Sequence, residues 1–176
     1  CSYRFTELQS SGMSKMIIDL RDNPGGVLDE ACNMADMILP EGIITYTETK
    51  SGKRTDYNSD AESLDIPIVI LINENSASAS EVFTGALKDY GKATVVGKKS
   101  YGKGIVQSVL PFYDGSGMSL TVAKYYTPNG TCIHGIGIEP DVEVDMPDEY
   151  KDMYASMVEH DKDTQLQKAI EIIKEK

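Results

Sequence analysis

The 176-residue chain contains no tryptophan, only two histidines and only three cysteines. Zinc sites use several Cys, His or carboxylate ligands at short fixed spacings. The chain has no CxxC pair among Cys1, Cys32 and Cys132, and its only histidines are His134 and His160. Three cysteines also do not make an even disulfide set. The sequence therefore predicts no metal site, and the thiols are interpreted as packed or incidental side chains.

Long hydrophobic runs are also missing. No stretch approaches the ~18 apolar residues of a membrane-spanning helix, and no charged-then-apolar leader opens the chain. With 40% hydrophobic and 26% charged residues, the composition is that of one globular domain.

Positive charge is scarce. The 17 Lys and Arg residues face 28 Asp and Glu residues, which gives a net charge of −11. A field of that sign opposes a phosphate backbone, so the sequence predicts no nucleic-acid partner.

The hydrophobic pattern alternates between strands and helices. Apolar residues at three- and four-residue steps predict helices from residue 27 to before Pro40 and from about residue 80 to Gly91. The most apolar run, residues 66–72, is typical of a central strand that is covered on both faces. Further strands are predicted at residues 16–20, 43–48, 93–96, 105–110 and 118–126, and an exposed loop at residues 50–63. This order predicts an α/β fold with at least part of its sheet parallel.

The last residues differ in composition. Residues 139–163 hold ten acidic side chains, which we interpret as a solvated face. Residues 164–176 return to helical spacing and predict an amphipathic helix that needs a partner surface. We therefore divide the chain into a core, residues 1–146, and an acidic segment with a terminal helix, residues 147–176.

A serine cluster follows the central strand. A strand-to-helix junction exposes a side chain at the sheet edge, and the helix N-terminus offers free N–H donors to a developing oxyanion. Ser78 occupies that position. The same residue with Glu81 also fits a capping box, so the pattern alone leaves a structural role open.

A serine nucleophile needs a base. Neither His134 nor His160 lies near an obvious strand end, whereas Lys103 lies in a glycine-flanked turn just before an apolar strand. Burial would lower the pKa of a lysine there and make it a base. Gln107, two strand steps further, would share a face with Lys103 and orient its amine.

The same lysine allows a competing hypothesis. Residues 97–104 have the GxxxxGK spacing of a phosphate-binding loop. Gly104 replaces the serine or threonine that would hold magnesium, and a strand rather than a helix is predicted to follow, so we disfavour it.

A glycine turn follows the first strand, at residues 19–26. Its structural interpretation is a strand exit with Arg21 in a surface ion pair. Its functional interpretation is a backbone donor, because Gly25 and Gly26 allow close approach.

Five motifs in order carry a family resemblance: residues 19–26 (DLRDNPGG), 76–81 (SASASE), 101–107 (YGKGIVQ), 125–130 (YYTPNG) and 137–141 (GIEPD). The chain closely resembles the carboxy-terminal processing proteases, the S41 family of tail-specific serine endopeptidases. The resemblance implies a ClpP/crotonase-like core of spiralled strands and helices.

The resemblance also implies roles for residues. A Ser/Lys dyad falls on Ser78 and Lys103, and Gln107 matches the glutamine that positions the lysine. Oxyanion donors match the Ala79 amide and Gly25 or Gly26. No cofactor is implied.

The family implies protein or peptide substrates with accessible C-termini, a possible homo-oligomer and a location on the periplasmic or extracytoplasmic side of the cell envelope. Family members usually carry a PDZ domain ahead of the glycine turn, which we expect upstream in the full-length protein. The usual opening strand is expected to be missing or replaced by residues 1–5.

Two other functions stay open. The same fold with an idle dyad would be a peptide-binding or assembly module. A crotonase-like enzyme acting on acyl thioesters would use the oxyanion donors but leave Ser78 and Lys103 unexplained.

Overall fold

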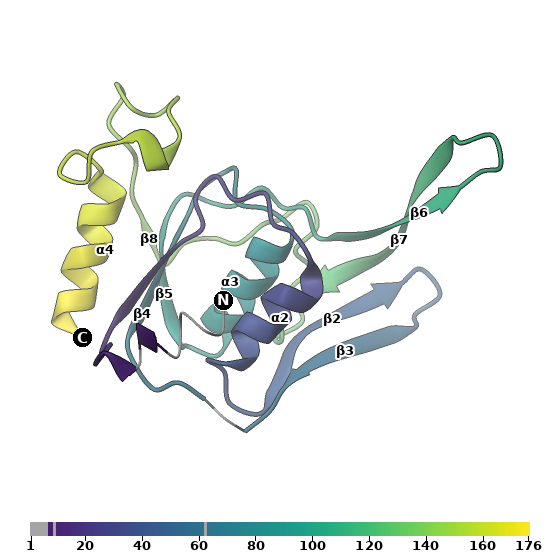
Figure 1. The fold of residues 1–176 in the computed structure, drawn as a ribbon, viewed down its shortest axis with the longest axis horizontal. Coiled ribbons are helices and arrows are strands. Elements are labelled where there is room, and N and C mark those ends of the chain that lie inside the picture. The colour runs from purple at the N-terminus through teal and green to yellow at the C-terminus, as the bar shows by residue number, and fades with distance from the viewer. Residues whose placement is uncertain (1–6, 9, 62) are drawn as a thin grey trace.

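Two four-stranded sheets form the framework of the computed structural model, which describes residues 7–8, 10–61 and 63–176. The first sheet is parallel, with strand order β1-β4-β5-β8, and the second is antiparallel, with order β3-β2-β7-β6 (Figure 1). The parallel strands are β1 (Met16–Asp19), β4 (Ile68–Ile72), β5 (Ala93–Gly97) and β8 (Val142–Glu143). The antiparallel strands are β2 (Gly42–Thr49), β3 (Arg54–Ser59), β6 (Ile105–Pro111) and β7 (Gly117–Tyr126). The helices are α2 (Leu28–Asp36), α3 (Ala79–Asp89) and α4 (Thr164–Glu175), with a short 3-10 helix η1 (Ala155–Met157).

Strand β4 is the centre of the fold, and all five of its side chains are buried. Ile68, Ile70 and Ile72 belong to the main core with α2 and α3, whereas Val69 and Leu71 belong to a second cluster with α4. Burial on both faces confirms the interpretation of this apolar run as a central strand and the prediction of an α/β fold with parallel pairing.

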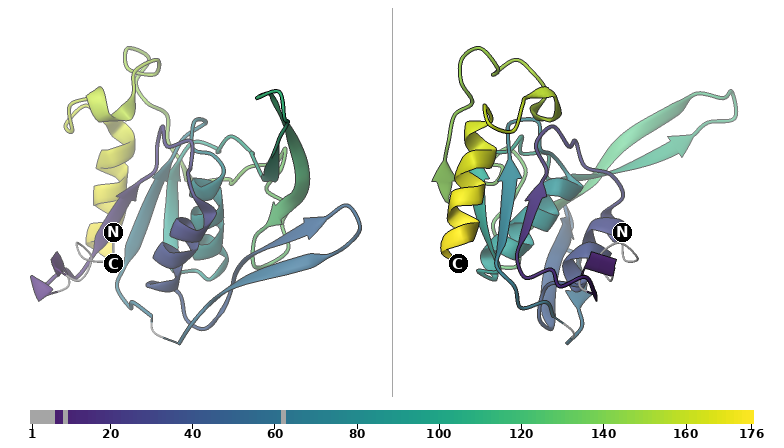
Figure 2. Two further views of the ribbon diagram at one scale, coloured as in Figure 1. Left: turned by 45° about the vertical axis from the view of Figure 1, so that its right-hand side comes forward. Right: turned by 60° about the vertical axis from the view of Figure 1, so that its left-hand side comes forward.

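The partner surface of the terminal helix is the chain's own parallel sheet. Helix α4 packs on β1, β4 and β5, on the face opposite α2 and α3 (Figure 2). Ala169 and Ile173 are buried against Val69, Leu71 and Val96. The terminal helix is therefore part of the core packing.

The predicted loop at residues 50–63 is wrong in part, because it contains β3. This strand pairs antiparallel with β2 and with no other strand, so it is an edge strand. Its side chains are polar and mostly exposed, so hydrophobic alternation gave no signal. The cross-strand contact of the Arg54 guanidinium, 3.6 Å from the Tyr46 ring centre, helps to hold it.

Strands β6 and β7 continue beyond the body of the domain as a two-stranded ribbon (Figure 1). Leu110 lies opposite Met118 in its register, and both side chains are exposed, as are those of Leu120 and Val122.

Cys1 and the expected opening strand at residues 1–5 lie outside the described residues. In the part of the chain that the structure describes, no helix is long and apolar enough to cross a membrane.

Candidate functional site

Ser78 follows the carboxyl end of the central strand β4 and is the N-cap residue of helix α3. Its backbone has φ 57° and ψ −117°, a conformation that L-residues rarely adopt. Such strain at a strand–turn–helix junction lifts a side chain out of the chain's path and is typical of nucleophilic serines. Ser78 is half-buried.

The two neighbouring serines have structural contacts instead. The buried Ser76 hydroxyl donates to the Leu20 carbonyl at 2.7 Å and accepts from the Asn73 N–H at 3.0 Å. The buried Ser80 hydroxyl donates to the Asn23 carbonyl at 3.2 Å. These bonds tie the serine loop to the end of β1 and the glycine turn.

Glu81 links the serine loop (residues 73–78, between β4 and α3) to the lysine loop (residues 98–104, between β5 and β6). Its carboxylate is 1% exposed and accepts four hydrogen bonds. Oε2 accepts the N–H groups of Ser78 and Lys103, each at 2.8 Å, and Oε1 accepts the Ser100 hydroxyl and the Gly102 N–H, each at 2.6 Å. The capping-box prediction identified only the Ser78 half of this arrangement, because a sequence pattern shows local partners and not the distant loop.

Lys103 therefore lies next to Ser78 in the backbone network, but its side chain is exposed. The prediction that the flanking residues bury Lys103 is wrong for the described residues. Gly102 and Gly104 are buried while the lysine between them points to solvent. Gln107 lies on β6 opposite Thr121, also exposed, next to an irregularity in the β6–β7 register.

The lysine loop packs on the turn that contains His134. A Cβ on Gly104 would overlap the His134 backbone N–H and the Ile133 backbone, and the Gly135 N–H donates to the Gly102 carbonyl at 2.9 Å. The structure thus brings His134 close to the loop, although the sequence suggested no such proximity. Its side chain is exposed.

The glycine turn lies directly against Ser78. Gly25 has φ 93°, and a Cβ there would lie 2.5 Å from the Ala77 carbonyl oxygen, 2.8 Å from the Ala79 nitrogen and 3.0 Å from Ser78 Cβ. A Cβ on Gly26 would meet nothing within 4 Å. The Gly25 N–H donates to the Asn23 side chain at 3.0 Å, so this donor is already used within the turn.

Arg21 is not in a surface ion pair, contrary to the structural interpretation of this turn. Its side chain is 2% exposed and contacts Asp19 at 2.6 Å and Asp163 at 2.7 Å. Burial by itself lowers the pKa of Arg21, but hydrogen bonds and charges from both carboxylates raise it above its ordinary value. The guanidinium stays charged inside the protein because two carboxylates neutralise it.

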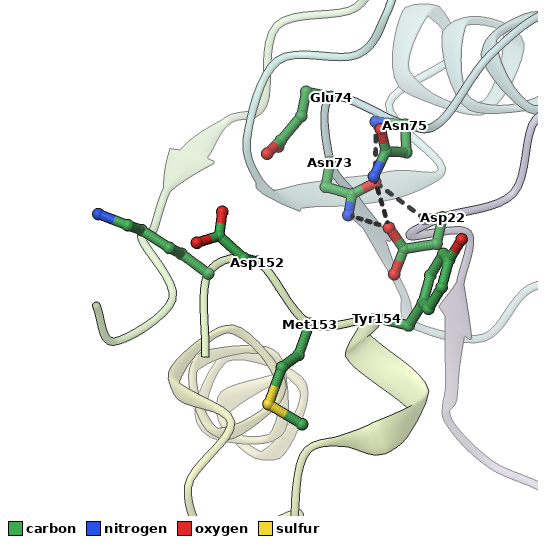
Figure 3. A pocket seen from close by; sticks show the side chains of 8 residues that line it. Asp22, Asn73, Glu74, Asn75, Asp152, Met153 and Tyr154 are labelled. Carbon is green, nitrogen blue, oxygen red and sulfur yellow. Dashed lines mark hydrogen bonds between the residues drawn. The ribbon is translucent and has the colours of Figure 1, made fainter. Parts of the chain in front are cut away.

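A polar pocket of about 380 Å³ is lined by residues of the glycine turn, of the loop after β4 and of the segment before η1 (Figure 3). Its lining includes Asp22, whose carboxylate accepts the side-chain amides of Asn73 at 2.9 Å and Asn75 at 2.8 Å. Neither Ser78 nor Lys103 lines it, and we assign no chemistry to it. Within the described residues no group of three His, Cys, Asp or Glu side chains could hold a metal ion.

The phosphate-loop hypothesis does not fit the fold. The residues after Gly104 form strand β6, as predicted, and the helix N-terminus that a phosphate would need is absent there.

A strained serine at a helix N-terminus, a glycine turn against it and a lysine loop joined to it by one carboxylate define a serine-hydrolase type of site. The sequence model of peptidase family S41 matches residues 2–144, and the chain belongs to that family.

Curated relatives carry related names. The chain is 52% identical over 141 residues to the Staphylococcus aureus (strain bovine RF122 / ET3-1) protein named "Probable CtpA-like serine protease", covering 77% of this chain and 28% of that protein. It is 44% identical over 142 residues to the carboxyl-terminal-processing protease of Synechocystis sp., covering 80% and 33%. The chain thus spans about a third or less of the length of these relatives.

Solved structures share the fold. The photosystem II D1 C-terminal processing protease superposes with a TM-score of 0.75 and 40% identity, over 81% of this chain and 38% of that one. A lipoprotein from Streptococcus agalactiae superposes with a TM-score of 0.76 over 99% of this chain and 59% of that one, and at 19% identity this shows the fold alone. These matches confirm the ClpP/crotonase-like core.

Proposed function

We propose that this chain is the catalytic core of a serine endopeptidase that cleaves polypeptides near their C-termini through a Ser78/Lys103 dyad. The observation that carries the proposal is the Glu81 carboxylate, which fixes the backbones of both residues through one oxygen atom. The names of the S41 relatives support cleavage near the C-terminus.

The chemistry follows from the groups around Ser78. The Ser78 hydroxyl oxygen attacks a peptide carbonyl while the neutral amine of Lys103 takes its proton. The amine then returns this proton to the leaving amide nitrogen as the C–N bond breaks and an acyl ester forms on Ser78. Water, deprotonated by the same amine, hydrolyses the ester and restores the serine.

The oxyanion is stabilised by backbone donors. The Ala79 N–H belongs to the first residue of α3, where amides lack partners within the helix and carry a partial positive charge. We assign the second donor to the Gly26 N–H, because the Gly25 N–H is used by Asn23. Gly25 instead supplies the close approach that brings the turn against Ser78.

The exposure of Lys103 sets a condition on activity. A general base must be uncharged to accept the Ser78 proton. A polypeptide that covers the site removes water from the amine and favours its neutral form. Gln107 then orients the amine, as the family resemblance implies.

The experiment combines a mechanism-based label with turnover. A fluorophosphonate probe should label Ser78 in the wild type, and an unfolded peptide substrate should be cleaved near its C-terminus. Ser78→Ala should abolish both, and Lys103→Arg should abolish turnover because a guanidinium cannot give up its proton at working pH. Ser76→Ala and His134→Ala should leave turnover within a few-fold.

Two outcomes would contradict the dyad. Substantial turnover in Lys103→Arg would exclude Lys103 as the base, and loss of turnover in folded His134→Ala would point to a histidine. Peptide binding with neither labelling nor turnover would instead identify an idle peptide-binding module.

A further inference from the structure

The segment that follows the S41 match places two polar side chains in the interior of the protein. The family match ends at residue 144, and most acidic side chains beyond it are exposed. Asp163 is the exception, with 1% exposure, and Gln165 is 2% exposed. The interpretation of residues 139–163 as a solvated face is therefore wrong at Asp163.

Both buried side chains bind Arg21. Asp163 Oδ1 accepts from Arg21 Nη1 at 2.9 Å, and its Oδ2 lies 2.7 Å from Nη2. Gln165 Oε1 also accepts from Nη1, at 3.1 Å, while the Gln165 amide donates to the Val144 carbonyl at 2.8 Å. Asp163 Oδ1 in addition accepts the Leu166 N–H at 2.9 Å and so caps helix α4. The start of α4 is thereby fixed to Arg21.

A second contact holds the next residue of the turn. Asp22, with φ 58°, accepts the Ala155 N–H at 2.8 Å as well as the amides of Asn73 and Asn75 (Figure 3). Residues 155 and 163 thus hold two consecutive residues of the glycine turn, Arg21 and Asp22.

The glycine turn is hydrogen-bonded to residues on both sides of Ser78. The Asn23 carbonyl accepts the Ala77 N–H at 3.1 Å and the Ser80 hydroxyl at 3.2 Å, on both sides of Ser78. Gly25, two residues further, lies so close to the start of α3 that a Cβ added to it would be 3.0 Å from Ser78 Cβ and 2.8 Å from the Ala79 nitrogen. A shift of Arg21 would therefore move the turn relative to the serine and its oxyanion donors.

We infer that Asp163 is a positioning residue: through the buried Arg21 it aligns the glycine turn with Ser78, so the C-terminal segment completes the active site that lies within the family match. The inference rests on the proposed function for its kinetic consequence. Misplacement of an oxyanion donor by a fraction of an ångström lowers the rate of the chemical step more than it changes substrate binding.

The test compares Asp163→Asn with Asp161→Asn, which removes the same charge from an exposed side chain two residues earlier. Asp163→Asn should lower kcat roughly 10–100-fold with KM within about two-fold, whereas Asp161→Asn should change neither. Gln165→Met keeps the volume but removes one acceptor from Arg21, and it should give a smaller loss of kcat. This second variant serves if Asp163→Asn does not fold.

Hydrogen exchange supplies a readout that does not depend on turnover. In folded Asp163→Asn, amides of residues 20–27 should exchange faster while those of β4 keep their wild-type rates. Equal exchange in Asp163→Asn and Asp161→Asn, or acceleration across β4 as well, would overturn the inference, as would wild-type kcat in a variant with a loosened turn. If the wild type proves inactive, the proposed function fails. The exchange rates alone then decide whether Asp163 positions the glycine turn.

Discussion

Ser78 and Lys103 donate their backbone N–H groups to the same oxygen atom, Oε2 of Glu81, each at 2.8 Å. The carboxylate thereby joins the two loops without using either functional side chain. Because it is buried, its negative charge is stabilised by hydrogen-bond donors rather than by water. The Glu81 carboxylate holds the two loops together along with a direct bond between them, in which the Tyr101 N–H donates to the Ser76 carbonyl at 3.0 Å.

Replacing Glu81 by Gln tests the contribution of the carboxylate. The side-chain NH₂ of glutamine cannot accept a hydrogen bond. Whichever carboxylate oxygen it replaces, the two donors that bond that oxygen in the wild type lose their acceptor. We expect a loss of about 2–4 kcal/mol in the free energy of unfolding and strongly reduced turnover. Denaturant titration and peptide hydrolysis measure the two effects, with the exposed Glu74→Gln as control. Wild-type turnover in Glu81→Gln would remove the carboxylate from the mechanism.

The two turn glycines make a matched pair. Gly25→Ala places a Cβ against the Ala77 carbonyl and the Ala79 nitrogen at a positive φ, so we expect it to cost more than ~2 kcal/mol and to abolish turnover. Gly26→Ala has open space and keeps its N–H, so turnover should stay within a few-fold. Thermal unfolding and hydrolysis assays compare them. Equal effects of the two substitutions would contradict the assigned contacts.

Asp22 should make stability depend on pH. Partial burial raises the pKa of Asp22, but hydrogen bonds from Asn75, the Ala155 N–H and Asn73 lower it below its ordinary value overall. A lowered pKa in the folded state stabilises the protein above the ordinary value, and this contribution is lost as pH falls through the folded-state value. Asp22→Asn should therefore destabilise the folded protein at pH 7, and the difference from wild type should shrink as pH falls through the folded-state pKa of Asp22.

The control for Asp22 is Asp152→Asn, which changes an exposed carboxylate of the same pocket. Asparagine also tolerates the positive φ of residue 22, so the comparison isolates the carboxylate. Chemical denaturation from pH 2.5 to 7 measures both variants. A pH-independent difference between Asp22→Asn and wild type would show that the carboxylate charge is not responsible.

The thiols should differ in reactivity. Burial, together with the charge of Asp29, raises the pKa of Cys32 to about 11. At pH 8 iodoacetamide should therefore leave Cys32 unmodified in the folded protein, while the partly exposed Cys132 reacts. Mass spectrometry of tryptic peptides locates the label on each of the three cysteines, and denaturant should make Cys32 react as well. Rapid labelling of Cys32 in the native state would contradict its burial.

The sequence predicted those elements whose signal is local. The bounds of β4, α3 and α4 follow from apolar spacing, and Ser78 was identified by its position at a strand-to-helix junction. Strand β3 was missed because Tyr57 is its one side chain packed on the hydrophobic core, which makes no alternating pattern, and β8 because two residues show no periodicity.

Side-chain environments depended on distant partners and could not be predicted. Arg21 was expected at the surface, but Asp163 buries it from far along the chain. Lys103 was expected to be buried because apolar residues follow it, yet those residues contact other parts of the fold. The dual contacts of Glu81 were missed for the same reason, since a capping pattern shows only the nearer loop.

The uniform burial of β4 means that hydrophobicity alone does not fix the register of this strand in the sheet. Each of its residues is a β-branched or leucine side chain, so sliding the strand by one position would exchange its two faces with little change in hydrophobic burial. Register must instead be set at its end. Gly97 of β5 fits there because a Cβ would collide with the Ile72 carbonyl, and the Lys98 N–H donates to that same carbonyl at 3.0 Å. Ser78 caps its helix a few residues after Ile72. The close packing of Gly97 on Ile72 therefore fixes the end of β4 and, with it, the position of the nucleophile.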